Sequence, residues 1–237
     1  MYDWLAFALS WDAVWLVLYA LKPNLRRQML WVSVFTTLTG LAEPIFVPRY
    51  WNPPSLFNLT STTHFDLESL IFSWGTGGIG SVLYEAMLNL KHRKMAPDER
   101  KRERRWLHMF SLLSVPSIFL GLYFFTNLNP IYCLSAGLLV GGVAAVACRP
   151  DLAWNTLVGG LLFTGLYFAL FASIVAVSPS FVNAWNLSAL SGILVVGVPL
   201  EELMFAFTFG MMWSGVYEHI RYYAIRRANK GYKRTQP

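Results

Sequence analysis

The sequence predicts an all-α polytopic membrane protein with seven transmembrane helices, arranged as two parallel three-helix repeats joined by a fourth helix. Three observations predict this class: the composition, the placement of the charged residues and an internal similarity. Of the 237 residues, 55% are hydrophobic and only 14% are charged, whereas soluble domains carry roughly 25% charged residues. Apolar stretches of about 20 residues can cross a bilayer, and inside lipid they must be helical to satisfy their backbone hydrogen bonds.

Seven apolar stretches follow one another along the chain. They cover residues 3–21, 29–47, 66–90, 106–126, 130–148, 155–178 and 188–222. The last stretch is too long for one straight span, and Pro199 is expected to divide it into a short outer piece and the membrane helix. A count of six, in which 130–148 or 155–178 does not cross, is the alternative. The distribution of positive charge favours seven.

The lysine and arginine residues set the orientation. Three follow the first helix, eight lie in 91–105, one lies between the fifth and sixth helices, and six close the chain, so 18 of 19 share one side and only Arg49 lies on the other. Cytoplasmic loops carry this excess, which predicts an outer N-terminus and a cytoplasmic C-terminus in the cell membrane. The basic segments are expected to face anionic lipid rather than nucleic acid.

The internal similarity aligns residues 65–85 with 198–218 at a constant offset of 133. The matched pairs are Leu67/Leu200, Glu68/Glu201, Leu70/Leu203, Phe72/Phe205, Gly77/Gly210, Ser81/Ser214, Tyr84/Tyr217 and Glu85/Glu218. Weaker echoes relate 22–25 to 149–152, and Trp51-Asn52 to Trp185-Asn186. We therefore predict a first repeat with a basic loop (1–105), a linking helix (106–128) and a second repeat with a basic tail (129–237), related by an axis along the membrane normal.

Carboxyl groups inside the membrane are the candidate catalytic residues, because they are costly to bury and usually functional. Glu43, Asp66, Glu68, Glu201 and Glu202 fall in the outer half of the predicted helices. Adjacent helical residues point about 100° apart, so only one of Glu201 and Glu202 can face the repeat axis, and Glu201 is favoured because it matches Glu68. The alternatives are structural hydrogen bonds for Glu68 and Glu201, and an interfacial place beside Arg49 for Glu43.

Other polar residues are expected to be interfacial. Glu85 and Glu218 lie at the inner helix ends, where pairing with Lys91, Arg221 or lipid headgroups is the simplest interpretation. The four histidines also lie near helix ends. The chain has neither a Cys/His metal spacing nor a dinucleotide fingerprint, so we predict no metal and no cofactor.

An acid in an apolar, aromatic-rich cavity suits acid catalysis on an apolar substrate. A carboxylic acid buried in apolar surroundings tends to remain protonated, and a proton added to an alkene makes a carbocation that aromatic faces can stabilise. Trp74, Phe205 and Trp213 on the repeat helices, and Trp51 in the outer loop, are the expected substrate-binding residues. The alternative is that these rings only pack the core or anchor the interface.

Three segments resemble the lycopene cyclase domain, the small membrane type. They are residues 43–54, Asp66-Leu67-Glu68-Ser69 and Pro199-Leu200-Glu201-Glu202. The resemblance implies an intramolecular lyase, a kind of isomerase, that cyclises the ψ-ends of lycopene to β-ionone rings without net redox change. It also implies that Glu201 and Glu202 form the acidic pair, with Glu68 at the matching position. The first half departs from the pattern, with Asp66 in place of proline and Ser69 in place of the second glutamate.

We therefore expect a carotenoid cyclase in which Glu201 donates a proton and Glu202 or Glu68 takes the final one. The expected partners are an apolar carotenoid, the bilayer, and other carotenoid enzymes or further copies of the chain. The alternatives are a proton-coupled small transporter, another seven-helix protein or an assembly partner of carotenoid enzymes. A retinal protein is disfavoured because all six lysines fall in loops or the tail.

Overall fold

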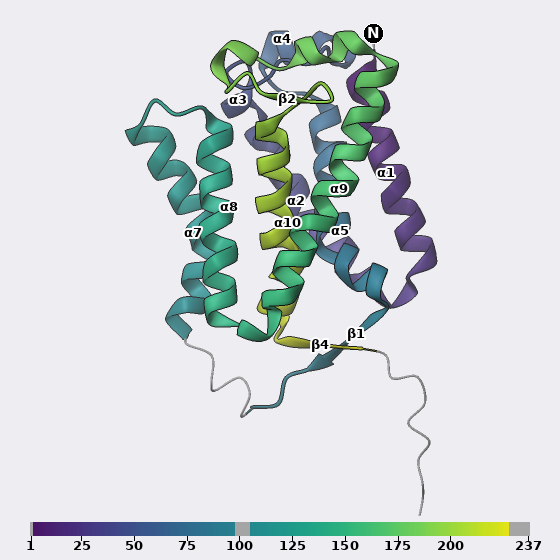
Figure 1. Cartoon of the computed structure of the whole chain (residues 1–237), viewed down its shortest axis with the longest axis vertical. Coiled ribbons are helices and arrows are strands. Elements are labelled where there is room, and N and C mark those ends of the chain that lie inside the picture. Colours follow the sequence, from purple (N-terminus) through teal and green to yellow (C-terminus); the bar gives the residue numbers. More distant parts are fainter. Residues whose placement is uncertain (1, 98–104, 228–237) are drawn as a thin grey trace, which may run out of the picture.

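The computed structural model describes residues 2–97 and 105–227 and is built from helices that run between two ends of the molecule (Figure 1). The helices are α1 (Asp3–Leu21), α2 (Arg26–Thr37), α3 (Glu43–Phe46), α4 (Leu59–Thr63), α5 (Leu67–Leu88), α7 (Arg105–Phe125), α8 (Pro130–Cys148), α9 (Ala153–Val177) and α10 (Leu200–Arg221). The strands are β1 (Leu90–Lys94), β2 (Leu194–Val195), β3 (Val198–Pro199) and β4 (Tyr223–Arg227). The all-α prediction is therefore confirmed, and the short strands form one two-stranded pair at each end of the helix bundle.

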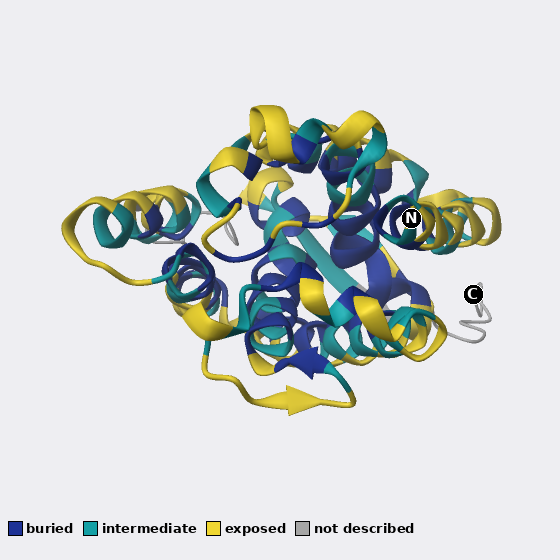
Figure 2. Ribbon diagram, turned by 90° about the horizontal axis from the view of Figure 1, so that it is seen from above, coloured by how far each residue is buried: buried dark blue, intermediate teal, exposed yellow. Residues whose placement is uncertain are grey.

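Five helical segments are long and apolar enough to cross a membrane. They are Asp3–Leu21, Pro23–Phe46, Leu107–Phe125, Pro130–Cys148 and Pro150–Val177. The helices α5 and α10 have 22 residues each and are not among these five. Both lie in the middle of the bundle, where 14 residues of α5 and 12 of α10 are buried. Figure 2 shows this buried centre surrounded by helices with exposed outer faces. A helix surrounded by protein can be less apolar than one surrounded by lipid.

Two helices begin elsewhere than the apolar stretches indicated. The stretch 188–222 is helical only from Leu200, directly after Pro199, while 179–199 forms 3-10 turns and the β2–β3 hairpin. The stretch 29–47 starts earlier, in a 3-10 turn at Pro23 that leads into α2. Proline suits the first position of a helix because it has no N–H to satisfy there. The division of the last stretch at Pro199 is as expected.

Corresponding elements in the two halves have matching bounds. The helix α8 (130–148) begins and ends 127 positions after α1 (3–21), and α10 (200–221) begins and ends 133 positions after α5 (67–88). The 3-10 turns Pro23–Leu25 and Pro150–Leu152 also differ by 127 positions, and each leads into the next long helix. The same offsets relate the similar sequence segments, 127 for residues 22–25 and 149–152, and 133 for residues 65–85 and 198–218.

The two halves also meet through reciprocal backbone contacts at both ends of the bundle. At one end, the Asn52 N–H donates to Ala184 O at 2.7 Å and the Asn186 N–H donates to Tyr50 O at 2.9 Å, on either side of a bridge between Trp51 and Trp185. At the other end, β1 and β4 pair antiparallel, with the register centred on His92 and Ile225, which are 133 positions apart. Figure 1 shows this strand pair below the helices.

Seven of the basic residues that set the expected orientation lie outside the described residues. They are Arg100, Lys101, Arg102, Arg104, Lys230, Lys233 and Arg234.

Glycines allow α9 and α10 to approach closely. A Cβ atom added at Gly210 would lie 2.9 Å from the Cα atom of Gly160 and 2.7 Å from the Cβ atom of Phe163. A backbone atom at that distance cannot move aside without shifting a helix, so the crossing depends on the absence of a side chain at Gly210.

We predict that Gly210→Ala destabilises the folded protein by about 1–3 kcal/mol, as overpacking of a tight contact does. Gly165→Ala is the matched control on α9, since nothing lies within 4 Å of its added Cβ atom, and alanine stabilises a helix relative to glycine. Thermal unfolding in detergent measures both. Equal unfolding temperatures for the two variants would contradict the close crossing.

Candidate functional site

The first turn of α10 presents a buried carboxyl group that three side chains hold. Glu202 is 3% exposed. Its Oε1 atom accepts hydrogen bonds from the Tyr50 hydroxyl at 2.5 Å and the Trp185 indole at 2.8 Å, and its Oε2 atom accepts one from the Tyr167 hydroxyl at 2.6 Å. The three donors come from the loop after α3, from α9 and from the loop before β2. Burial and the neighbouring Glu202 carboxyl group raise the pKa of Tyr50 well above its ordinary value, so the phenol keeps the proton that it donates.

A second buried carboxyl group faces the same space from the first half of the chain. Glu43 begins α3 and is 7% exposed. It lies close to the Ser69 hydroxyl and the Trp51 indole, while its Oε1 atom has no hydrogen-bond partner among the described residues. Ser69 occupies the position in α5 that Glu202 occupies in α10, 133 positions later. The first half therefore supplies its carboxyl group from a different helix.

Glu43 and Glu202 line one cavity of about 140 Å³ together with aromatic side chains. The rings in its wall are Trp4, Phe46, Tyr50, Trp51, Phe72, Tyr167, Phe171 and Phe205. Ser69 and Ser73 are among the few other polar residues there. Two carboxyl groups and a wall of π faces make an apolar chamber that can deliver a proton, stabilise a cation and accept a proton.

The chamber continues into an apolar cleft along α2 and α10. A cavity of about 450 Å³ shares Phe46, Phe72, Leu134 and Phe205 with the chamber, and its outer wall includes Leu112, Val115 and Phe119 of α7. A third cavity of about 310 Å³ shares Thr36, Trp213 and Val216 with the second. The shared lining residues place the three cavities next to one another, from the chamber toward the opposite end of α10.

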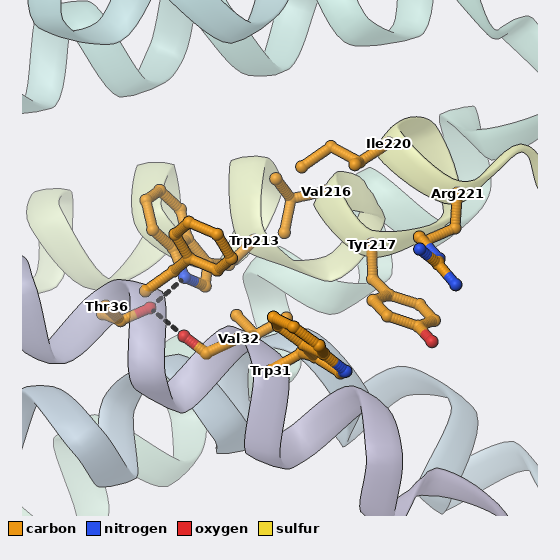
Figure 3. A pocket seen from close by; sticks show the side chains of 9 residues that line it. Trp31, Val32, Thr36, Trp213, Val216, Tyr217, Ile220 and Arg221 are labelled. Carbon is orange, nitrogen blue, oxygen red and sulfur yellow. Dashed lines mark hydrogen bonds between the residues drawn. The ribbon is translucent and has the colours of Figure 1, made fainter.

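Figure 3 shows the far part of this cleft, where Trp31, Val32 and Thr36 of α2 face Trp213, Val216 and Tyr217 of α10. The Trp213 indole donates a hydrogen bond to the Thr36 hydroxyl at 2.9 Å, which holds the ring against α2. Arg221 lies at the end of the cleft. The lining between these ends is almost entirely hydrocarbon and aromatic, as a long apolar ligand requires.

The corresponding space on the other side of the bundle is filled. Phe163 and Tyr167 of α9 stand 127 positions after Thr36 of α2 and Gly40 of the 3-10 turn that follows it, and both rings are buried. They contact Trp11 of α1 at ring-centroid distances of 5.6 and 5.7 Å, in edge-to-face geometry. Large buried rings therefore stand at the positions that match Thr36 and Gly40, two small residues that line the cavities.

Three of the predicted catalytic carboxyl groups instead organise loops and a helix end. Glu201 accepts hydrogen bonds from the Tyr132 hydroxyl at 2.5 Å and the Ser191 N–H at 2.8 Å, and the matching Glu68 accepts one from the Leu56 N–H at 2.7 Å. Asp66 caps α5 by accepting the Ser69 N–H at 2.6 Å. None of the three lines the cavities described above.

The expectation that Glu201, rather than Glu202, faces the cavity is therefore wrong in its geometry. The two side chains leave α10 about 100° apart, and the helix is turned so that Glu202 points inward and Glu201 points to the loop before β2. The match between Glu201 and Glu68 reflects a shared loop contact. The catalytic role predicted for Glu201 remains to be tested by mutation.

The predicted substrate-binding aromatics are divided between two places. Phe205 and Trp213 line the cleft, and Trp51 and Phe205 line the chamber. Trp74 lines neither and packs on Trp15 of α1 at a ring-centroid distance of 5.6 Å. The sequence interpretation did not include Tyr167 and Trp185, which both donate hydrogen bonds to Glu202. Tyr167 carries no special signal in the sequence. Trp185 could have been found, because Trp185-Asn186 resembles Trp51-Asn52.

The region that contains this site matches a known family. Residues 129–220, which include α8, α9 and the Pro199-Leu200-Glu201-Glu202 segment, match the family model described as lycopene cyclase. Neither curated proteins nor solved structures give a significant match. Residues 129–220 of this chain are therefore similar to the lycopene cyclase family.

Proposed function

We propose that this chain is a membrane-embedded cyclase that converts the acyclic ψ-end of a linear carotene such as lycopene to a β-ionone ring. The observation that carries the proposal is the apolar cleft along α2 and α10, which leads to a chamber with two buried carboxyl groups. We place a long hydrocarbon chain in the cleft, with its end beside Glu43 and Glu202, the two carboxyl groups among the described residues of the chamber wall.

The hydrogen bonds suggest which carboxyl group is the acid. Glu202 receives three donors, and donors stabilise the charged form of a carboxyl group. Glu43 has an unpaired buried oxygen, which costs less for a neutral acid than for a carboxylate. We therefore assign Glu43 as the proton donor and Glu202 as the carboxylate that stabilises the cation and takes the final proton.

The reaction balances without an oxidant or reductant. The Glu43 proton adds to the terminal alkene and leaves a tertiary carbocation. The π electrons of the neighbouring internal alkene form the new ring bond and move the positive charge onto the ring. Loss of a ring proton to Glu202 makes the ring double bond, so one proton enters, one leaves, and the product is an isomer of the substrate. Trp51, Phe171 and Phe205 line the chamber, and we assign their ring faces the role of stabilising the cation.

We further infer that α5 and α10 cross the membrane with the five apolar segments, and that the halves are two repeats around a twofold axis. The matching helix bounds and the reciprocal contacts at both ends support the repeats. The 18-to-1 distribution of lysine and arginine supports an outer chamber and a cytoplasmic β1–β4 pair.

We predict that Glu202→Gln and Glu43→Gln each lower the conversion of lycopene by about 10²–10⁴-fold, the usual loss for one general acid or base. Glutamine keeps the size of the side chain but cannot transfer the proton. Expression in lycopene-accumulating bacteria with pigment chromatography measures conversion, and membrane levels of each variant are measured in parallel.

Glu201→Gln is the matched control one residue away. Glutamine keeps the Oε1 atom that accepts from Tyr132 and Ser191, so we expect conversion within a few-fold of the wild type. Loss of activity in Glu201→Gln with normal activity in Glu202→Gln would reverse the assignment made here and restore Glu201 as the acid.

We predict that Leu112→Trp, which places a larger ring in the cleft, lowers conversion by on the order of 10-fold or more, as steric misfit in an apolar pocket does. The carboxyl groups and their donors are not touched by this change. Leu113→Trp on the same helix is the control, because Leu113 is 54% exposed and lines none of the three cavities. Unchanged pigment production by Leu112→Trp would argue against the cleft as the substrate route.

We predict that a tag at the N-terminus is accessible from outside intact cells, and that tags in 91–105 or after Arg226 are accessible only from the cytoplasm. Protease or labelling experiments on intact and opened cells distinguish the two sides. Finding both termini in the cytoplasm would require an even number of spans and would refute the seven-span arrangement.

A further inference from the structure

The end of the bundle opposite the chamber contains a second buried polar cluster. Glu85 lies near the end of α5, Glu218 near the end of α10 and His92 on β1. The carboxyl residues are 1% and 0% exposed and occupy corresponding positions, 133 residues apart. The expectation that they are interfacial and paired with Lys91 or Arg221 is therefore wrong, because the β1–β4 pair and the helix ends enclose them.

The contacts within the cluster leave acceptor atoms unused. The His92 Nε2 atom lies 2.5 Å from Glu218 Oε1, which also accepts a hydrogen bond from the Gln28 amide at 3.2 Å. Both carboxyl oxygens of Glu85 and the Oε2 atom of Glu218 have no hydrogen-bond partner among the described residues. One ligand atom from each of Glu85, His92 and Glu218 lies within 4.8 Å of the others. Two carboxyl groups so close together require a shared proton or a cation between them.

We propose that Glu85, His92 and Glu218 bind one divalent transition-metal ion such as Zn²⁺. Two carboxylate oxygens and one imidazole nitrogen form a donor set that first-row divalent metals accept, with room for water or another ligand in the remaining position. The geometry supplies an unpaired, buried carboxylate aimed at the site, which is the ligand that a metal ion would satisfy.

A surface pocket lies next to this site. Glu85 lines a pocket of about 360 Å³ with Lys22, Asn89 and Lys91, beside the start of β1. The bound ion would join α5 and β1 of the first half to α10 of the second, next to the β1–β4 pairing. Its role is therefore to hold the halves together at this end, and it is independent of the cyclisation proposed above.

A second group of candidate ligands, His108, Cys148 and His219, is less suited to a metal. The two imidazole rings stack with centroids 4.2 Å apart and planes 10° from parallel, so they present faces rather than nitrogen lone pairs to each other. The Nε2 atom of His219 is also engaged with the Ser111 hydroxyl at 2.9 Å. This group differs chemically from the proposed site because it contains a sulfur ligand.

The test uses the full chain, purified in detergent without a polyhistidine tag, stripped with EDTA and titrated with Zn²⁺. We expect one Zn²⁺ per chain by elemental analysis after gel filtration, and a higher unfolding temperature when Zn²⁺ is bound. Glu85→Gln and His92→Gln should each weaken binding by at least about 100-fold, since even the loss of an outer-shell partner costs 10–100-fold. His64→Gln, at an exposed histidine, should bind as the wild type does.

X-ray absorption of the Zn²⁺-bound wild type tests the site without any variant. The proposal requires nitrogen and oxygen ligands at about 2.0–2.2 Å and no sulfur at about 2.3 Å. A sulfur ligand would overturn it in favour of the Cys148 group. Absence of stoichiometric Zn²⁺, or unchanged affinity in Glu85→Gln, would overturn it in favour of a carboxyl pair that shares a proton. None of these outcomes depends on whether the protein cyclises lycopene.

Discussion

The burial of the Glu202 carboxyl group is the constraint on which the chamber end of this protein depends. A buried charge is tolerated only when hydrogen bonds replace the water it has lost, and a hydrogen bond to a charged group contributes roughly 1.5–3 kcal/mol. The three donors come from α9 and from one loop of each half at the chamber end. The hydrogen bonds to Glu202 therefore also hold both loops against the end of the bundle. The proposed reactive carboxyl group is thus also the group that joins these loops.

The two halves use one scaffold for different purposes. Helices with matching bounds pack in corresponding ways, yet Phe163 and Tyr167 fill on one side the space that Thr36 and Gly40 leave open on the other. The carboxyl groups differ likewise, because Ser69 stands where the second half has Glu202, and the first half supplies Glu43 from α3 instead. Two halves with matching helix bounds thereby hold one asymmetric cleft, which suits the linear substrate proposed above.

Both ends of the bundle bring corresponding residues of the halves together, but with opposite chemistry. At one end the Trp51–Trp185 bridge lies beside the chamber, whose carboxyl groups face apolar rings and hydrogen-bond donors. At the other end the β1–β4 pair covers Glu85 and Glu218, whose free oxygens face each other and His92. The first arrangement favours proton exchange with carbon, and the second favours a cation.

The sequence by itself determined the membrane class, the offsets between similar segments and the concentration of carboxyl groups near one end of the helices, because these follow from composition and from spacing along the chain. Only the tertiary structure decided which carboxyl group lines the chamber. Glu201 and Glu202 differ by one residue, and the rotation of α10 that separates their roles is set by its packing against α8 and α9. Contacts such as Tyr50 with Glu202 and Gln28 with Glu218 join residues 152 and 190 positions apart. Local patterns carry no information about such contacts, so the burial of Glu218 and the meeting of Glu43 with Glu202 appear only when the chain is folded.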